Sequence, residues 1–337
     1  MTWLTWRQFR SQATTLYAAV AVCVLVAVIT GSRLPRTAAN VFDLLTPGDR
    51  RFYFTGLIVM ALAPALVGAF LGAPLVAREL ETGTHRLAWS QGVTRTRWLA
   101  TKFGLAALAV AVAVGALSLV VTWWAAPLDG AQSSTQGSLP ARLTPVSFAM
   151  RGIAPVGYAV FALVLGVAVG MVLRRSVPAI ALTLAVFTFV QIAMPFWVRP
   201  HLLRPTTQLV TISMDTMAGI GFKDSDPAPT LNVRSPAGSW VLSDRTVDAA
   251  GRVVPLPSSF VDCLPGPPAP GQPDGAVVEV KPRLDTCLTQ LSAAGYQQQL
   301  VYQPASRFWP LQWAETGLFL VLSALLAWFS FYRLRRV

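Results

Sequence analysis

The stretch VARELETGTHRLAWSQGVTRTRWLATKFG, residues 76–104, is the most polar part of the first half of a very apolar chain. It contains two Glu residues, a Gly-Thr pair, a short segment with a Trp, and several basic residues. Long uncharged runs lie on both sides of it. Because an uncharged run of this length suits a bilayer core, the pattern predicts a polar loop between two membrane-spanning helices.

The composition of the whole chain supports this interpretation. Of its 337 residues, 54% are hydrophobic and only 12% are charged, and the mean hydropathy is +0.53. Soluble proteins carry about 25% charged residues. The net charge of +12 would suggest a nucleic-acid partner in a soluble protein. In a membrane protein it follows from the excess of Lys and Arg in cytosolic loops, so we expect no nucleic acid.

The spacing of the charged residues locates the spans. Five runs are uncharged, and the last run holds one acid, Glu315. Each exceeds the roughly 20 residues that a helix needs to cross a bilayer. The first is longer than the roughly 7–15 residues of a signal-peptide core, so we expect an uncleaved anchor. The predicted spanning helices cover residues 14–31, 54–76, 103–126, 152–173, 177–198 and 311–332.

The distribution of basic residues predicts the orientation. With both termini in the cytosol, the segments 1–13, 77–102, 174–176 and 333–337 lie there. They are rich in Arg, and their only acids are in the second segment. This is the bias that the positive-inside rule describes. We therefore expect a multi-pass protein of the plasma membrane with cytosolic N- and C-termini.

Two segments differ from the spans in composition. Residues 1–13 place aromatic residues at helical spacing opposite Arg and Gln, which predicts an interfacial amphipathic helix in contact with membrane lipids. Residues 199–306 are rich in Pro and hold most of the acids, which predicts a small outer domain. Within it, 239–256 is expected to form a hairpin and 282–300 a short helix.

The fold class that follows is an all-α polytopic membrane protein. It has six transmembrane helices, an N-terminal interfacial helix, and a small mixed α/β outer domain between helices 5 and 6. Spans 1–5 and the loop 77–102 occupy residues 14–198. The last span and a basic cytosolic tail occupy residues 307–337.

The chain has three Cys residues. Cys23 lies in the first span, where we expect inert packing. Cys263 and Cys287 lie in the expected outer domain, on either side of a Pro-rich loop. Because disulfides form outside the cytosol, we expect these two residues to be bridged.

Few polar residues lie in the predicted spans. Glu315 is placed near the outer end of the last one, where it is expected to face lipid headgroups or to pair with Arg307. A substrate gate or a subunit contact is the alternative. Gln191 in the fifth span is expected to form a hydrogen bond with another helix or to line a pathway. Rows of small residues, such as Gly68 with Gly72 and Gly166 with Gly170, predict close helix packing within one subunit or between two.

Catalytic motifs are absent from the sequence. None of the three Lys residues ends a phosphate-binding loop, and no His-Glu-x-x-His helix is present. We expect no catalytic residues, no bound cofactor and no metal in this chain, which disfavours an intramembrane enzyme. Energy for any transport must then come from a partner.

The loop 77–102 is the candidate docking element for that partner. Gly83 predicts a turn, and Thr84 is expected to cap a short helix over 85–91 that presents Leu87 and Trp89. A loop that only sets topology is the alternative. The expected docking residues are Glu79, Glu81, Gly83, Thr84, Arg86, Leu87, Trp89, Ser90 and Arg95.

This loop, together with six spans and an interfacial N-terminal helix, resembles the membrane subunits of ABC-2 type ABC transporters, the permeases of type V exporter fold. The residues that match the family's first cytosolic loop are Glu79, Glu81, Gly83, Thr84, Leu87, Ser90, Val93, Arg95, Trp98 and Lys102. The outer domain departs from many such permeases, so the resemblance does not indicate a substrate.

The resemblance implies a permease homodimer or pseudodimer bound to two cytosolic ABC ATPase subunits, which carry ATP-Mg. The short helix would transmit ATPase closure to the spans. The usual task of the family is export of a drug, antibiotic, peptide or lipid-linked molecule. The main alternative is a membrane sensor or scaffold whose outer domain binds a ligand without transport.

Overall fold

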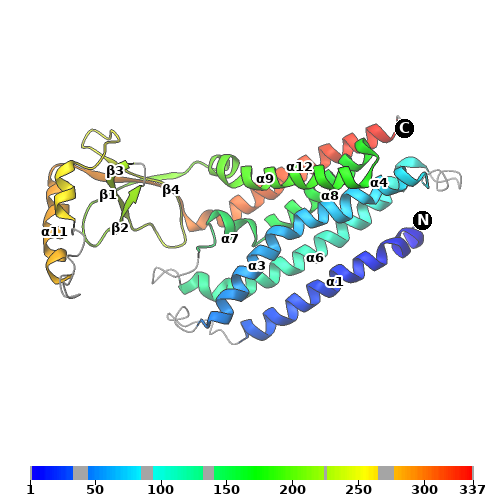
Figure 1. Ribbon diagram of the computed structural model, residues 1–337, viewed down its shortest axis with the longest axis horizontal. Coiled ribbons are helices and arrows are strands. Elements are labelled where there is room, and N and C mark those ends of the chain that lie inside the picture. Colours follow the sequence, from blue (N-terminus) through cyan, green and yellow to red (C-terminus); the bar gives the residue numbers. More distant parts are fainter. Residues whose placement is uncertain are drawn as a thin grey trace. The chain divides into compact units, whose positions relative to one another are not determined.

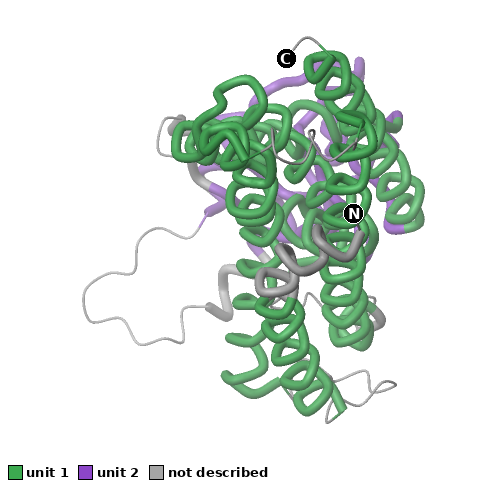
Figure 2. The backbone as a smooth tube through the Cα atoms, turned by 90° about the vertical axis from the view of Figure 1, so that its right-hand side faces the viewer, with its two compact units in different colours: residues 1–203, 306–337 green, residues 204–305 purple. Residues whose placement is uncertain are grey.

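The computed structural model describes residues 2–32, 45–84, 94–131, 140–223, 226–264 and 277–335. These residues form two compact units (Figure 2). The first comprises Met1–Leu203 and Ser306–Val337, and the second Arg204–Ala305. The second unit lies within the segment 199–306 that composition singled out. The first is built of helices, and the second of strands and helices (Figure 1).

Five helices in the described residues are long and apolar enough to cross a membrane. With several such helices, the chain is a polytopic membrane protein. The first consists of α3 (Pro47–Leu66), the π-helical η1 (Val67–Gly72) and α4 (Ala73–Thr82). The second is α6 (Arg95–Ala131), and the third is α8 (Ala154–Leu173). The fourth consists of α9 (Ser176–Ala193), the π-helical η2 (Met194–Val198) and α10 (Arg199–Leu202), and the fifth is α12 (Phe308–Leu334).

The N-terminal helix differs from the sequence prediction. Helix α1 runs without a break from Thr2 to Gly31, so there is no boundary between an interfacial helix and a span at residue 13. Its apolar described part, Tyr17–Gly31, is shorter than the other five helices. It packs along α6, where the Tyr17 hydroxyl donates to the Ala109 carbonyl at 3.1 Å. A sixth span over 14–31 therefore stays a prediction.

Helix α8 is the centre of the first unit. In its apolar stretch 72% of the residues are buried, against 22–39% in the other four spans. Glycine makes this possible, because a Cβ atom at Gly166 would lie 2.2 Å from the Gly68 carbonyl oxygen. At Gly72 it would lie 2.5 Å from the Leu163 oxygen. The predicted close packing of small residues is confirmed, and these rows act within one subunit.

Proline marks the irregular parts of the spans. Pro64 lies in the last turn of α3, which continues into η1, and Pro195 lies in η2. Proline removes a helical hydrogen bond, and a π-helical turn is one way in which the backbone accommodates the disruption. Pro155 and Pro178 lie near the starts of α8 and α9, where the missing N–H has no helical partner.

The second unit contains two antiparallel sheets. One has the order β1-β5-β4, from β1 (Thr206–Thr211), β5 (Gln297–Gln303) and β4 (Trp240–Val247). The other pairs β2 (Met217–Lys223) with β3 (Asp226–Val233). Helix α11 (Val277–Ala293) supplies Leu284, Leu288 and Leu291 to a core shared with both sheets. Side chains link the sheets, because Asp244 accepts from the Val233 N–H at 2.8 Å and Gln298 donates to the Leu231 carbonyl at 2.8 Å.

Two predictions for this unit can be compared with the structure. The expected hairpin over 239–256 is confirmed in part: after β4 the chain turns and returns antiparallel to it, with a bridge between Val247 and Val253, but the longer ladder of β4 is formed with β5. The expected helix over 282–300 ends at residue 293, and the rest enters β5. The predicted disulfide is confirmed, since Cys263 and Cys287 are bonded with Cα atoms 6.3 Å apart.

Candidate functional site

On either side of the predicted docking segment, the structure describes the end of α4 and the beginning of α6. Gly83 terminates α4 with φ 73°, a left-handed conformation that suits glycine. The Thr84 hydroxyl lies 3.1 Å from the Thr82 hydroxyl, within hydrogen-bond distance. At the other end, Thr94 accepts from the Arg97 N–H at 3.3 Å and so caps α6.

The middle of this segment, residues 85–93, lies outside the described residues. The helix over 85–91 and the four docking residues within it therefore keep the status of predictions. These residues are Arg86, Leu87, Trp89 and Ser90. Arg95 is described and is the exposed first residue of α6.

Glu79 forms an ion pair with Lys102, which joins α4 to α6. Lys102 is buried, and its ammonium group lies 4.8 Å from the centre of the Trp98 ring. It also donates to the Leu75 carbonyl at 3.4 Å. A buried charge needs such partners, so the contact fixes how far apart the two ends of the loop lie.

Glu81 joins α4 to a third helix. Its carboxylate accepts from the backbone N–H and from the hydroxyl of Ser176, at 3.1 and 2.8 Å. Ser176 is the first residue of α9, where the first N–H groups have no helical partner. A carboxylate there satisfies one of them and interacts favourably with the helix dipole. The two predicted acids thus fasten the end of α4 to α6 and to α9.

Glu315 does not face outward toward lipid headgroups, and it pairs with Arg199 rather than with Arg307, contrary to the prediction. It is fully buried and pairs with Arg199, which is also fully buried. Two hydrogen bonds of 2.8 and 2.9 Å join the groups. The hydroxyl of Tyr158 on α8 donates to the same carboxylate. The carboxylate is thus enclosed by groups of its own chain, and a role of Glu315 as a substrate gate or subunit contact stays a prediction.

Arg199 and Gln312 hold the short segment that contains α7 (Pro145–Ala149). Arg199 donates to the Pro145 carbonyl at 3.0 Å and stacks over the Phe148 ring at 4.3 Å. The Gln312 amide, one turn before Glu315, accepts from two backbone N–H groups and donates to two carbonyls of residues 148–154. All four hydrogen-bonding positions of this buried side chain are used.

Gln191 serves helix packing. Its amide donates to the Ala61 carbonyl at 3.1 Å, which joins α9 to α3. This confirms the prediction of a hydrogen bond to another helix.

Sequence reasoning missed Arg199 and Tyr158 as partners of Glu315. In the sequence, Arg199 is the first residue after the predicted fifth span. The topology contained a signal, because the fifth span ends and the sixth begins on the same side of the membrane. A basic residue at one and an acid at the other are therefore candidates for pairing. Nothing in the sequence pattern indicated Tyr158.

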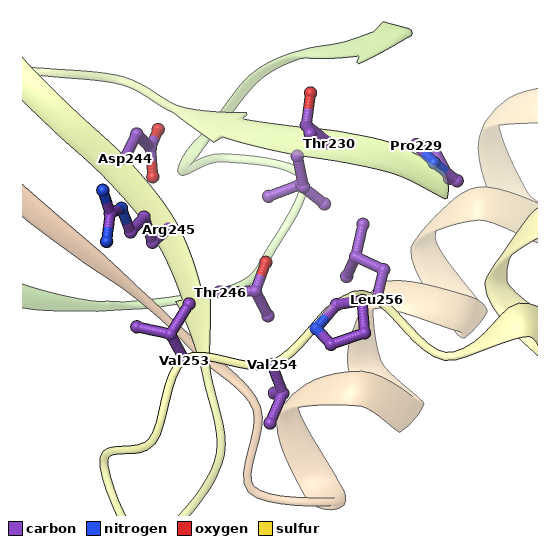
Figure 3. A pocket seen from close by; sticks show the side chains of 10 residues that line it. Pro229, Thr230, Asp244, Arg245, Thr246, Val253, Val254 and Leu256 are labelled. Atoms are coloured by element: carbon purple, nitrogen blue, oxygen red, sulfur yellow. The ribbon is translucent and has the colours of Figure 1, made fainter. Parts of the chain in front are cut away.

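The second unit contains a pocket of about 260 Å³ (Figure 3). Its walls come from β3, from β4 and from residues 253–256, and they are mainly apolar. Burial raises the pKa of the Asp244 carboxyl above its ordinary value, although the Val233 N–H opposes this effect. The other oxygen of that carboxylate is buried without a hydrogen-bond partner among the described residues. Because this oxygen has almost no accessible surface, a ligand in the pocket could not reach it, and it does not indicate which class of ligand the pocket would bind.

These observations describe a bundle of spanning helices in which the end of α4, beside the polar loop, is attached to α6 and α9. A match to a known family agrees with this description. Residues 1–199 match the family model described as ABC-2 membrane transporter related. The chain belongs to this family. No curated protein and no solved structure matches it.

The resemblance to ABC-2 type permeases inferred from the loop is thereby confirmed, and the chain is a membrane transporter subunit. The matched region contains the whole loop and ends at Arg199, the residue that pairs with Glu315. The second unit and α12 lie beyond the matched residues.

Proposed function

We propose that this ABC-2 permease is the membrane subunit of an ATP-driven exporter. It would have six spans and cytosolic termini, and a separate ATPase would dock on residues 84–91. The observation that carries the proposal is the attachment of the loop. Glu79 ties α4 to Lys102 of α6, and Glu81 ties it to Ser176 of α9.

This attachment supports a mechanical role for the loop. A force applied to residues 84–91 would act on α4, α6 and α9 together rather than being absorbed by a slack chain. Helix α4 in turn packs against α8, where Gly170 allows contact with the Ala73 backbone. Transmission of this kind requires elements that are packed and have two discrete arrangements. The packing supplies the first requirement, and the two π-helical segments are candidate points of rearrangement.

The proposed assembly contains two permease chains and two ATPase subunits. ATP-Mg would bind only to the ATPases. Residues 204–305 would lie outside the cell, which the disulfide between Cys263 and Cys287 supports, because such bridges persist in oxidising compartments. The proposed substrates are drug-like molecules, antibiotics, peptides or lipids, and the proposed direction is export.

The test is purification of the chain from its native membranes in mild detergent, followed by mass spectrometry of the subunits that copurify. We expect an ATPase with a phosphate-binding loop, in equal amount to the permease. We also expect ATP hydrolysis that is lost when that subunit is removed. If the intact chain instead purifies without an ATPase and binds a ligand through residues 204–305, it is a sensor or scaffold.

A further inference from the structure

Strand β1 forms one edge of the three-stranded sheet, and the ladder shows which of its backbone groups face outward. In an antiparallel ladder each residue directs its N–H and its C=O to the same side of the strand, and successive residues alternate between the two sides. The Val254 N–H donates to the Thr246 carbonyl on the side of β4 that faces away from β5. Residues 245 and 247 of β4 therefore bond to Gln299 and Gln297 of β5.

The same alternation continues across β5 to β1. If 297 and 299 bond to β4, then Gln298, Leu300 and Tyr302 bond to β1. Their partners in the register are the even-numbered residues 210, 208 and 206. The outward N–H and C=O groups of β1 thus belong to Thr207, Leu209 and Thr211. In agreement, the Thr211 carbonyl accepts from a side chain outside the sheet, the Thr216 hydroxyl at 2.7 Å.

The two edges of this sheet are treated differently. The β4 edge is covered by its own chain, because the Val254 N–H donates to Thr246 and the Asp248 N–H donates to Arg252, both at 3.0 Å. Among the described residues, β1 is covered only at its end, where the Thr216 hydroxyl bonds to the Thr211 carbonyl and leaves that oxygen a second lone pair. Strand β1 contains no charge and no Pro, and its register with β5 is unbroken over 206–211. Natural proteins normally use charge, Pro or bulges to protect an edge from pairing. Leu209 is also 55% exposed.

We propose that β1 pairs antiparallel with β1 of a second copy of this chain and joins two three-stranded sheets into one. The outward residues read Thr-Leu-Thr, which is the same in both directions. With a two-fold axis at Leu209, that residue meets its own copy and Thr207 meets Thr211. Thr–Thr and apolar pairs are favourable across strands, and no like charges meet. A two-fold interface requires a self-complementary surface of this kind.

The pairing rests on the permease dimer of the proposed function. An independent interface needs to bury about 1,000 Å², and a short strand edge buries less than that. It therefore requires the spans to hold two copies together at high effective concentration. Only residues 203–205 separate α10 from β1, which keeps the connection short.

The experiment uses full-length chain in its native membranes, with Cys23→Ala as background and Leu209→Cys as probe. A short bifunctional thiol reagent is added, because directly opposed side chains lie about 4.5–5.5 Å apart at Cβ. We expect a covalent dimer. The matched control is Val253→Cys, in the segment that covers the β4 edge, which has nearly the same exposure, 57% against 55%. It should give several-fold less product.

A second variant tests the ladder itself. Thr207→Pro removes an outward N–H but no bond to β5, and edge strands tolerate such a proline. Added to Leu209→Cys, it should reduce the cross-link several-fold while the Cys263–Cys287 bridge remains intact by peptide mapping.

Four results would overturn the pairing. Equal product from Leu209→Cys and Val253→Cys would mean random collision. A cross-link to a different polypeptide would mean another partner. A dimer by native mass measurement without a cross-link at residue 209 would refute the edge pairing and leave the permease dimer intact, whereas a monomer without a cross-link would refute both.

Discussion

The carboxylate of Glu315 and the guanidinium of Arg199 form a doubly hydrogen-bonded ion pair in which neither side chain is exposed. Arg199 begins α10, just before the chain enters the second unit, and Glu315 lies in α12, just after the chain returns. The pair therefore holds together the two helix ends at which the inserted unit is connected.

Removing the charge of Glu315 should destabilise the bundle strongly. Glu315→Gln keeps the shape of the side chain but leaves Arg199 buried without a counter-ion. Breaking a buried pair in this way costs about 3–5 kcal/mol. Thermal unfolding of the purified chain in detergent would measure it. The double variant Arg199→Met, Glu315→Leu removes both charges and should recover much of the loss, and an unchanged unfolding temperature for Glu315→Gln would contradict the role of the pair.

Close packing around α8 predicts a contrast between two glycines. Gly166→Ala places a methyl group 2.2 Å from the Gly68 carbonyl oxygen, so α8 and η1 must separate. Overpacking of this kind costs about 1–3 kcal/mol. Gly104→Ala in α6 meets nothing within 4 Å and should be neutral or stabilising by up to about 1 kcal/mol, because Ala favours helix. Unfolding temperatures in detergent would compare the two, and equal effects would argue against contact at Gly166.

Loss of the disulfide should weaken the second unit. The bridge spans 24 residues and lies beside the apolar core. In the chain-entropy model a loop of this length contributes about 3 kcal/mol. The double variant Cys263→Ala, Cys287→Ala should therefore be cleaved faster by protease within residues 204–305. The spans should keep their helix content by circular dichroism. Free thiols at both positions in protein extracted without reductant would contradict the bridge.

The elements predicted correctly share one physical basis, which is contrast in composition. The absence of charge indicated the spans, the Pro-rich acidic segment indicated the second unit, and two Cys residues in it indicated the bridge. These features are local and need no knowledge of neighbours. The longer ladder between β4 and β5 was not predictable in this way, because alternation in 239–256 does not specify a partner strand from elsewhere in the chain.

The partners of the buried polar residues were not predicted, for a related reason. Glu315 was assigned to the surface because a lone acid in an apolar run is costly in lipid. Its partners lie 116 and 157 positions away, on α10 and α8, and only the packed bundle brings them together. For the loop, the sequence identified Glu79 and Glu81 but not their partners Lys102 and Ser176 as contacts. The docking residues 86–90 themselves lie outside the described residues.

The proposed docking of an ATPase on residues 84–91 leads to the last prediction. Trp89→Asp or Leu87→Asp would place an unpaired charge in a desolvated contact, at a cost of several kcal/mol. Trp is often such an anchor. The spans should be unaffected, since the contacts of Glu79 and Glu81 at the loop ends remain. The variants should insert, keep their unfolding temperature, and lose the ATPase on copurification. Arg97→Ala, in the exposed first turn of α6 and outside the expected docking residues, is the control and should retain it. Should Trp89→Asp keep both the partner and full transport, the loop would be only a topology signal.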